Sequence, residues 1–309
     1  MNFRKNMTSK EYWMVRAEKW DRKLLGLENK ETKKLQAIYK SSFDEIHKEL
    51  LAFFDKYATE NNITLAEARK QLTPIEMADY QKSIVALKEI YKDTQSQYVL
   101  NEIQLLSARR DITRLEALLA AVNVELCKSS HSVQMSLLDM LTGVYTDTYN
   151  DAAALLGGTP LVLPTGAIEH MVDYPWSGKM FSERIWDNKR ALISKIKEDL
   201  VKGMIKGEST QKIAKKFKED LNVLLYQAER LVRTETNYCY NHAHKEVYKA
   251  CGVEKYEYLA IVDSRTSSVC LEHNGQVYLI DHSKVGDNFP PLHPNCRSTV
   301  MPYKDEWDF

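Results

Sequence analysis

Apolar residues recur every three or four positions through most of the first half of this chain, with charged residues between them. This spacing runs from Ser9 to about Tyr57 and resumes from Val99 to Leu156. Apolar residues at this spacing share one face of an α-helix. The pattern predicts one or two long helices in the first stretch and another in the second, with a possible break near Ser129-Ser130. Such helices pack as a bundle or an extended antiparallel hairpin.

Local signals place shorter helices between these two stretches. Thr64 with Glu67 begins a short helix, and Thr73-Pro74-Ile75-Glu76 is a capping box with proline at the first helical position. The second signal predicts a helix that ends near Lys92. A strict heptad is not sustained, which argues against a coiled coil.

Glycine and proline mark the end of this helical region. Gly157-Gly158-Thr159-Pro160 and Pro164-Thr165-Gly166 bracket a short apolar run. We therefore predict a helical domain over residues 1–158 and a second domain over residues 159–309. The glycines carry no nucleotide-binding fingerprint, so a phosphate site is not expected there.

The second domain begins with further helices. Ser182 is the predicted cap of a helix that reaches Lys206, and Ser209 the predicted cap of a helix to about Glu219. Another helix is expected from about Asn222 to Cys251, where Gly252 ends it.

Towards the end of the chain the apolar period changes from that of a helix to that of a strand. Residues 256–262, 276–280 and 298–301 are three short strand candidates. The predicted fold is therefore α+β and predominantly helical, with long N-terminal helices followed by a C-terminal helical domain that carries a small antiparallel sheet.

Composition limits the classes of partner. Lys+Arg and Asp+Glu are both 43, so the protein as a whole has no net field that would attract nucleic acid or a membrane. No segment has the uninterrupted apolar length of a membrane span or a signal peptide, so we expect a cytoplasmic protein with no membrane partner. The five cysteines are odd in number and dispersed, which argues against a disulfide framework.

One local charge bias stands out. Between Lys189 and Lys218 there are ten basic residues and three acidic ones. The bias is typical of a solvated helix face, and it is also typical of a surface that contacts DNA phosphates without reading bases. The candidates for DNA contact are Lys195, Lys202, Lys206, Lys212, Lys215 and Lys216.

Two short cysteine and histidine motifs near the C-terminus have the spacing of metal ligands. Cys270 and His273 are separated by two residues, as are His293 and Cys296, with 19 residues between the inner pair. These four side chains could close a tetrahedral zinc site. A purely structural role through packing and hydrogen bonding is an alternative, and a cysteine–histidine nucleophile is another.

The C-terminal part of the chain contains four motifs: Arg233-Thr234-Glu235, Asp263-x-Arg265-Thr266, Cys270 with Gly275, and Pro290-Pro291-x-His293-Pro294-x-Cys296-Arg297. Together these motifs resemble the C-terminal domain of the phage minor head proteins of the Mu F type, also called head morphogenesis proteins. The likeness extends to Tyr12-Trp13 and to Pro175-Trp176-Ser177-Gly178, as in members from phages and prophages of Gram-positive bacteria. The residues that carry it as a structural signature are Arg233, Thr234, Glu235, Asp263, Arg265, Cys270, Gly275, His293, Cys296 and Arg297. In members of the family the position of His273 is usually not histidine, which weakens a four-ligand zinc site as a family trait and leaves a three-ligand site open.

The resemblance implies a minor component of the phage head. Its expected partners are the portal protein, a capsid or scaffolding protein and double-stranded DNA, and its expected locations are the host cytoplasm during assembly and then the head interior. No cofactor is required, zinc is a candidate, and no catalytic residue is predicted. The alternatives are a nonspecific DNA-binding protein and an enzyme, either metal-dependent or similar to ADP-ribosyltransferases, because Mu F-type domains occur fused to such toxins.

Overall fold

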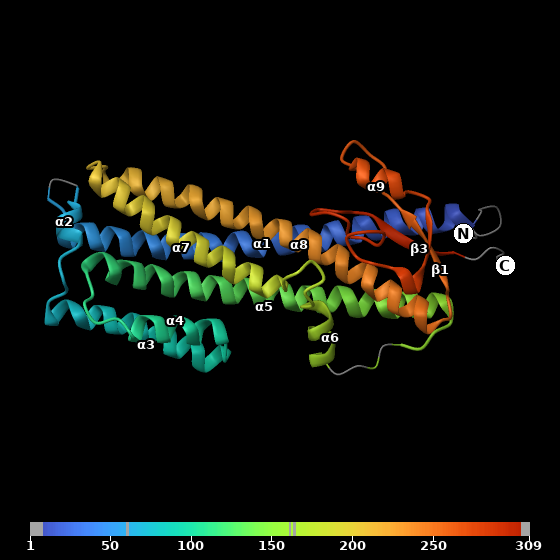
Figure 1. Ribbon diagram of the computed structural model, residues 1–309, viewed down its shortest axis with the longest axis horizontal. Helices are drawn as coiled ribbons and strands as arrows, with labels where there is room; N and C mark the ends of the chain where they lie inside the picture. The colour runs from blue at the N-terminus through green and yellow to red at the C-terminus, as the bar shows by residue number, and fades with distance from the viewer. Residues whose placement is uncertain (1–8, 60–61, 161, 163–164, 304–309) are drawn as a thin grey trace. The chain divides into compact units, whose positions relative to one another are not determined.

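The computed structural model describes residues 9–59, 62–160, 162 and 165–303, and it confirms the predominantly helical α+β fold (Figure 1). None of the helices in these ranges has the length and apolar character needed to cross a membrane. In chain order the elements are α1 (Ser9–Tyr57), α2 (Leu65–Ala68), α3 (Pro74–Thr94), α4 (Gln97–Ser107), α5 (Arg114–Leu156), α6 (Thr165–Val172), α7 (Phe181–Ile205), α8 (Thr210–Ala250), β1 (Lys255–Leu259), α9 (Ser268–His273), β2 (Val277–Leu279), the 3-10 helix Ile280–His282 and β3 (Thr299–Tyr303).

The first predicted stretch is a single helix, α1, of 49 residues. Its apolar stripe continues without a proline or a turn, and Leu35, Tyr39, Ile46 and Leu50 on that stripe are buried. Helices of this length are held mainly by packing of the apolar face rather than by local propensity.

The second predicted stretch is two helices, and its break lies at residues 108–113 rather than at Ser129-Ser130. Ser129 does not interrupt α5, because its hydroxyl donates to the Glu125 carbonyl one turn earlier, at 3.1 Å. Thr113 begins α5 as a capping box: its hydroxyl accepts from the Glu116 N–H at 3.3 Å, and the Glu116 carboxylate accepts from the Thr113 N–H at 2.9 Å.

The two helices predicted over residues 209–251 are one helix, α8. The predicted break between Glu219 and Asn222 was wrong, because Phe217, Leu221 and Leu224 continue one buried stripe through it. Ser209 does cap this helix, accepting from the Lys212 N–H at 3.4 Å. Gly252 ends it, as predicted, with a φ of 68° that favours glycine.

Two smaller differences concern the segment before α8. Ser182 is the second residue of α7 rather than its cap, since the helix begins at Phe181. The helix α6 (Thr165–Val172) was not predicted, and it follows the Gly-Pro segment proposed as a boundary.

Contacts group the chain into two compact units. Unit 1 comprises residues 1–33, 136–181 and 229–309, and unit 2 comprises residues 34–135 and 182–228. Helices α1, α5 and α8 therefore contribute residues to both units. Neither unit begins or ends at residue 158, and the domain boundary proposed there stays a prediction.

Unit 2 is held by an apolar core that includes one buried ion pair. Its core residues are Tyr80, Ile84, Leu87, Val99, Ile103, Leu106, Ile112, Ala120, Val124, Cys127 and Trp186. Trp186 Nε1 donates to Gln134 Oε1 at 2.8 Å. Lys189 is fully buried, and its Nζ lies 2.8 Å from Glu102 Oε1. This lysine, counted above in the basic stretch, is thus a core residue and cannot belong to a surface.

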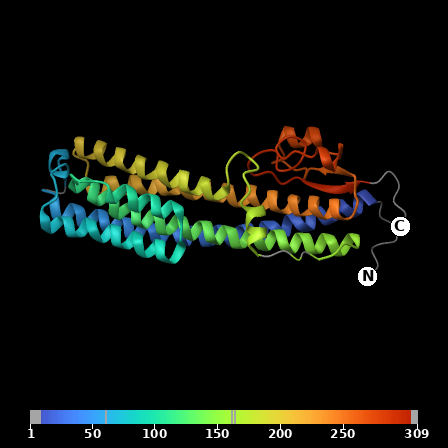
Figure 2. The ribbon, with the colours of Figure 1, turned by 60° about the horizontal axis from the view of Figure 1, so that its bottom comes forward.

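Unit 1 contains the three predicted strands, which form an antiparallel sheet of order β2-β1-β3. Tyr256 of β1 pairs with Tyr278 on one side and Pro302 on the other, and its buried ring lies 5.3 Å from that of Phe289. The sheet lies beside the C-terminal part of α8 in both views (Figures 1 and 2). Tyr248 of α8 donates its hydroxyl to the Val300 carbonyl at 3.2 Å, which ties β3 to the helix.

Candidate functional site

The loop before β3 is fastened to α8 by a polar network in unit 1. Asn237 Nδ2 and Asn241 Nδ2 both donate to the Ser298 carbonyl, at 2.9 and 3.1 Å. Thr234 Oγ1 accepts from the Asn295 N–H at 3.1 Å. These side chains are buried, so each bond replaces a contact with water that the group has lost. The signature residue Thr234 therefore positions the loop that carries His293 and Cys296.

A second signature group, around Asp263, joins the β1–α9 turn to the same loop. Asp263 accepts from the Arg265 N–H at 2.8 Å and from Arg265 Nη2 at 3.0 Å. The second contact is an ion pair within the turn. It also accepts from Arg297 Nη2 at 2.6 Å. The hydrogen bond from Arg297 and that from the Arg265 N–H hold the pKa of Asp263 below its usual range.

Two further signature residues have local structural roles, and a third lies at the surface. Gly275 adopts a φ of 81° between α9 and β2, and its N–H donates to the Tyr258 carbonyl at 2.8 Å. A side chain at this φ would be strained. Glu235 is 2% exposed and accepts from Trp176 Nε1 at 2.8 Å. Arg233 lies exposed on α8.

Trp176 extends this buried contact by stacking on a neighbouring ring. Its ring centroid lies 5.3 Å from that of Tyr238, with an interplanar angle of 14°. The segment after α6 is thereby held on α8 by one hydrogen bond and one aromatic pair. Glu235 thus contributes to packing in unit 1.

Three of the four predicted metal ligands converge. Cys270 Sγ lies 3.1 Å from His293 Nε2 and 3.7 Å from Cys296 Sγ, and the three ligand atoms all lie within 4.8 Å of one another. His273 lies apart from this group: its Nδ1 is 2.7 Å from the Tyr278 hydroxyl. The geometry therefore gives a three-residue cluster rather than the four-residue set, and zinc binding itself stays a prediction.

Local structure sets the positions of these three side chains. Cys270 lies in the first turn of α9, where its N–H donates to Ser267 Oγ at 3.2 Å. His293 and Cys296 lie in one turn, closed by the bond from the Cys296 N–H to the His293 carbonyl at 3.2 Å. Asn295 within that turn has a φ of 61°, a conformation that asparagine tolerates better than most residues.

The two thiols influence each other's ionisation. A hydrogen bond between Cys296 and Cys270 is the main cause that lowers the pKa of the Cys270 thiol, and the same bond raises the pKa of Cys296. Both residues are 2% exposed. One thiol of the pair is therefore poised to lose its proton before the other.

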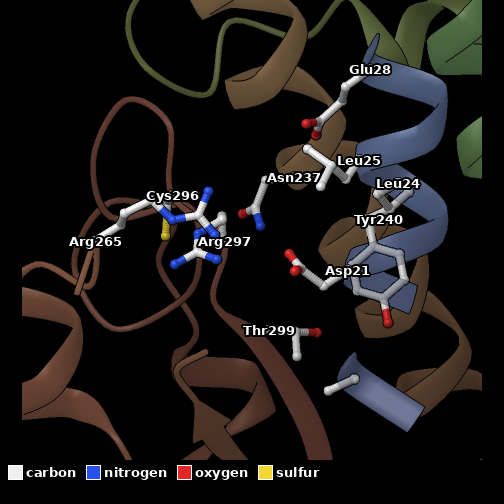
Figure 3. Close-up of a pocket in the computed structure, with 11 residues that line it drawn as sticks. Asp21, Leu24, Leu25, Glu28, Asn237, Tyr240, Arg265, Cys296, Arg297 and Thr299 are labelled. Atoms are coloured by element: carbon white, nitrogen blue, oxygen red, sulfur yellow. The ribbon is translucent and has the colours of Figure 1, made fainter. Parts of the chain in front are cut away.

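A small cavity in unit 1 brings two carboxylates towards the arginines. It has a volume of about 40 Å³, roughly enough for one water molecule. Asp21 and Glu28 of α1 face Arg265 and Arg297 across it, and the Asp21 carboxylate points toward the Arg297 guanidinium (Figure 3). Burial raises the pKa of Asp21, and it raises that of Glu28 to about 7.

Sequence reasoning missed these two acids. Asp21 and Glu28 are seven residues apart and so share a helix face, but that spacing is also common in solvated charged faces. Only the folded unit shows that the face is partly buried and that arginines lie opposite.

The six candidate lysines for DNA contact lie in unit 2, and four of them form ion pairs. Lys195 and Lys216 both contact the buried Asp199, at 2.8 and 2.7 Å. Lys212 pairs with Glu208 at 2.8 Å, and Lys202 pairs with Glu198. The lysines hold the pKa of Asp199, Glu198 and Glu208 below the usual range.

The remaining two candidates, Lys206 and Lys215, are exposed. Neither has an ion-pair partner within the part of the chain that the structure describes. These two lysines are the ones most available to a phosphate.

Comparison with known proteins gives one family and one distant relative. Residues 194–301 match the family model described as phage Mu protein F like protein. This range includes all ten signature residues, so the match confirms the resemblance noted in the sequence.

The relative is the NAD(+)–arginine ADP-ribosyltransferase EFV of Enterococcus faecalis (strain ATCC 700802 / V583), which is 23% identical over 266 residues. The aligned region covers 77% of this chain and 54% of the relative, so the chain spans about half of the relative's length. No solved structure matches the chain.

Replacing Trp176 with Phe is expected to destabilise unit 1. The variant keeps an aromatic ring but removes the indole N–H, which leaves a buried oxygen of Glu235 without that donor. We expect the free energy of unfolding, measured with urea, to fall by roughly 1–3 kcal/mol. Tyr174→Phe is the control, since Tyr174 is 58% exposed and its change should have little effect. Equal stability of the Trp176→Phe variant and wild type would contradict the structural role of Glu235.

Replacing Glu28 with Gln is expected to change how stability depends on pH. The carboxyl pKa is about 7 in the folded state against 4.5 for the free group, so between these pH values the folded state holds a proton that the unfolded state has released. Stability from this group therefore falls as pH rises through that window. Urea unfolding at pH 5 and pH 7 should show a loss for wild type that is smaller in the variant, by on the order of 1 kcal/mol. Glu18→Gln, at an exposed position of α1, should retain the wild-type slope.

Proposed function

We propose that the chain, in which residues 194–301 match the phage Mu protein F like family, is a minor structural component of the phage head that binds the portal protein. The observation that carries this proposal is that signature residues connect separate segments of the fold. Thr234, Asp263 and Glu235 each hold one segment of unit 1 to another. Because these side chains hydrogen-bond to other parts of unit 1, they keep its surface rigid, and a rigid surface is suited to binding a partner protein.

We place the portal contact on the N-terminal helices. Val85 of α3 and Leu105 of α4 are each 55% exposed, although both belong to helices whose other faces are buried. Single exposed apolar side chains are common on soluble proteins, and groups of them mark surfaces that bind other proteins. In this role the chain is made in the host cytoplasm, meets capsid or scaffolding protein during assembly, and ends inside the head.

The test is co-purification with the portal protein of the same phage. We expect the two proteins to elute together, and Val85→Asp with Leu105→Asp to weaken the complex by about tenfold or more, because two buried charges would replace apolar contacts. Val262→Asp is the matched control, at a residue 64% exposed in the β1–α9 turn. Absence of the protein from purified procapsids and virions would reject the proposal.

Double-stranded DNA is a second proposed partner, favoured by two exposed lysines, one directly after α7 and one on α8. Among the residues that the structure describes, Lys206 and Lys215 have no carboxylate partner. The exposed pair Lys202–Glu198 holds its lysine only weakly, and in the pair Lys212–Glu208 the lysine is exposed while the carboxylate is partly buried. A phosphate backbone can replace such carboxylates, so the surface would bind DNA without sequence preference.

Neutralising Lys206 and Lys215 together, as Lys206→Gln with Lys215→Gln, is expected to weaken DNA binding and to reduce its salt dependence. Each lost phosphate contact lowers the slope of log affinity against log salt by about 0.9. Fluorescence anisotropy with a duplex at several salt concentrations measures both. Lys33→Gln with Lys88→Gln, two exposed lysines outside the basic stretch, is the control. Salt-independent binding by wild type would contradict a DNA-contact role.

An enzymatic alternative follows from the name of the Enterococcus faecalis relative. A transferase acting from the Mu F-like region would need a carboxylate that reaches its substrate, whereas Glu235 is 2% exposed and holds the Trp176 indole. An arginine-modifying activity lost in Glu235→Ala and retained in Lys206→Gln with Lys215→Gln would favour this alternative.

A further inference from the structure

We propose that Cys270, His293 and Cys296 bind one zinc ion as a site with three protein ligands and an open fourth position. Thiolate sulfur and imidazole nitrogen are the ligands that zinc prefers, and sites with three protein ligands are well known where the fourth position is taken by water or another molecule. The proposal rests on this cluster alone and is independent of portal or DNA binding.

The spacing of the two sulfurs matches a shared tetrahedral ion. Zinc–sulfur bonds of about 2.3 Å at a tetrahedral angle separate two thiolates by about 3.8 Å. Cys270 Sγ and Cys296 Sγ are 3.7 Å apart. The same geometry requires a sulfur and a nitrogen about 3.6 Å apart, and the 3.1 Å between Cys270 Sγ and His293 Nε2 is within a small side-chain adjustment of it. The third pair, Cys296 Sγ and His293 Nε2, lies within 4.8 Å, so rotation of side chains has to bring these two atoms to a similar separation when the ion binds.

The hydrogen bonding of His293 presents the correct nitrogen. His293 Nδ1 lies 2.8 Å from the Pro294 carbonyl oxygen, which can only accept, so Nδ1 carries the proton. Nε2 is then the nitrogen that carries a lone pair, and it faces Cys270 Sγ. Metal-bound histidines are oriented in this way by a carbonyl or carboxylate behind the ring.

The surroundings suit two thiolates bound to a divalent cation. Cys270 and Cys296 are each 2% exposed, where two unpaired negative charges would be costly. One zinc ion makes the pair neutral. Tyr258 also donates its hydroxyl to Cys270 Sγ at 3.3 Å, as outer-shell groups do at metal thiolates. Ser267 Oγ lies 2.8 Å from His293 Nε2, so a bound metal would take over the lone pair to which this hydroxyl donates.

Zinc at this place would cross-link two segments of unit 1. Cys270 belongs to α9, which precedes β2, whereas His293 and Cys296 belong to the loop that precedes β3. The sheet has strands of five, three and five residues, which is little for independent stability. An ion held by both segments would stabilise the sheet from outside it.

Two other chemistries compete for the same atoms. A nucleophilic Cys270 with His293 as its base would use the 3.1 Å contact and would leave Cys296 without a role. A disulfide between Cys270 and Cys296 would require the sulfurs to approach from 3.7 Å to about 2 Å. Of the three chemistries, only the metal uses all three side chains.

The experiment measures zinc in the full chain, purified with reductant and without chelator. We expect about one zinc per chain by elemental analysis, and a content below about 0.1 in Cys270→Ser, Cys296→Ser and His293→Ala. His273→Ala should retain the metal, because His273 contacts the Tyr278 hydroxyl instead of the cluster. Cys251→Ser and His282→Ala are the matched controls, since both residues lie outside the cluster.

A second measurement does not depend on how well the variants fold. Wild-type chain stripped of metal and loaded with cobalt(II) should show the visible absorption of a tetrahedral site and a thiolate-to-cobalt charge-transfer band. Failure to bind zinc or cobalt would overturn the proposal. So would loss of the metal in His273→Ala, or rapid alkylation of Cys270 that added zinc does not slow.

Discussion

The structure of unit 1 depends on one carbonyl group. The Ser298 oxygen accepts from Asn237 and Asn241 of α8, and all three residues are buried. These bonds set where β3 begins, and through it the positions of Arg297, Cys296 and His293 just before. Because a buried amide left without a partner costs roughly 1–3 kcal/mol, the loop has a strong preference for this one position. The cysteine cluster and the Asp263–Arg297 pair both require it.

Most of the helical architecture could be predicted from the spacing of apolar residues, because burial on one face imposes that spacing. The errors lie where a local signal competes with the stripe. A polar residue such as Asn222 predicts the start of a new helix, but Phe217, Leu221 and Leu224 continue the buried stripe past it. The break before α5 was placed at two serines, whereas Thr113 and Glu116 form the capping box that begins the helix. A continuous apolar stripe in α8 and a capping box at the start of α5 therefore predict the helix boundaries better than isolated polar residues do.

The sequence predicts which residue types form the candidate site, but it does not predict which of the four residues come together. Cys270, His293 and Cys296 share a spacing that any reader of the sequence would test for metal, and the fold brings them together. His273 has the same spacing, but a short helix directs its ring to Tyr278 instead. Lys189 and Glu28 show the converse case. Their partly or wholly buried environments come from contacts between distant segments, and no local pattern encodes such contacts.

Charged side chains have different roles in the two units. In unit 1 the guanidinium groups of Arg265 and Arg297 both donate to the Asp263 carboxylate, so they are already paired within the fold. In unit 2 the buried Asp199 holds Lys195 and Lys216 in place, while Lys206 and Lys215 remain exposed. An exposed lysine without a carboxylate partner loses little by contacting a phosphate, whereas Arg297 would have to leave Asp263, which joins the β1–α9 turn to the loop of Cys296. The proposed contact with DNA therefore falls on Lys206 and Lys215 and leaves the Asp263 pairs of the signature region unbroken.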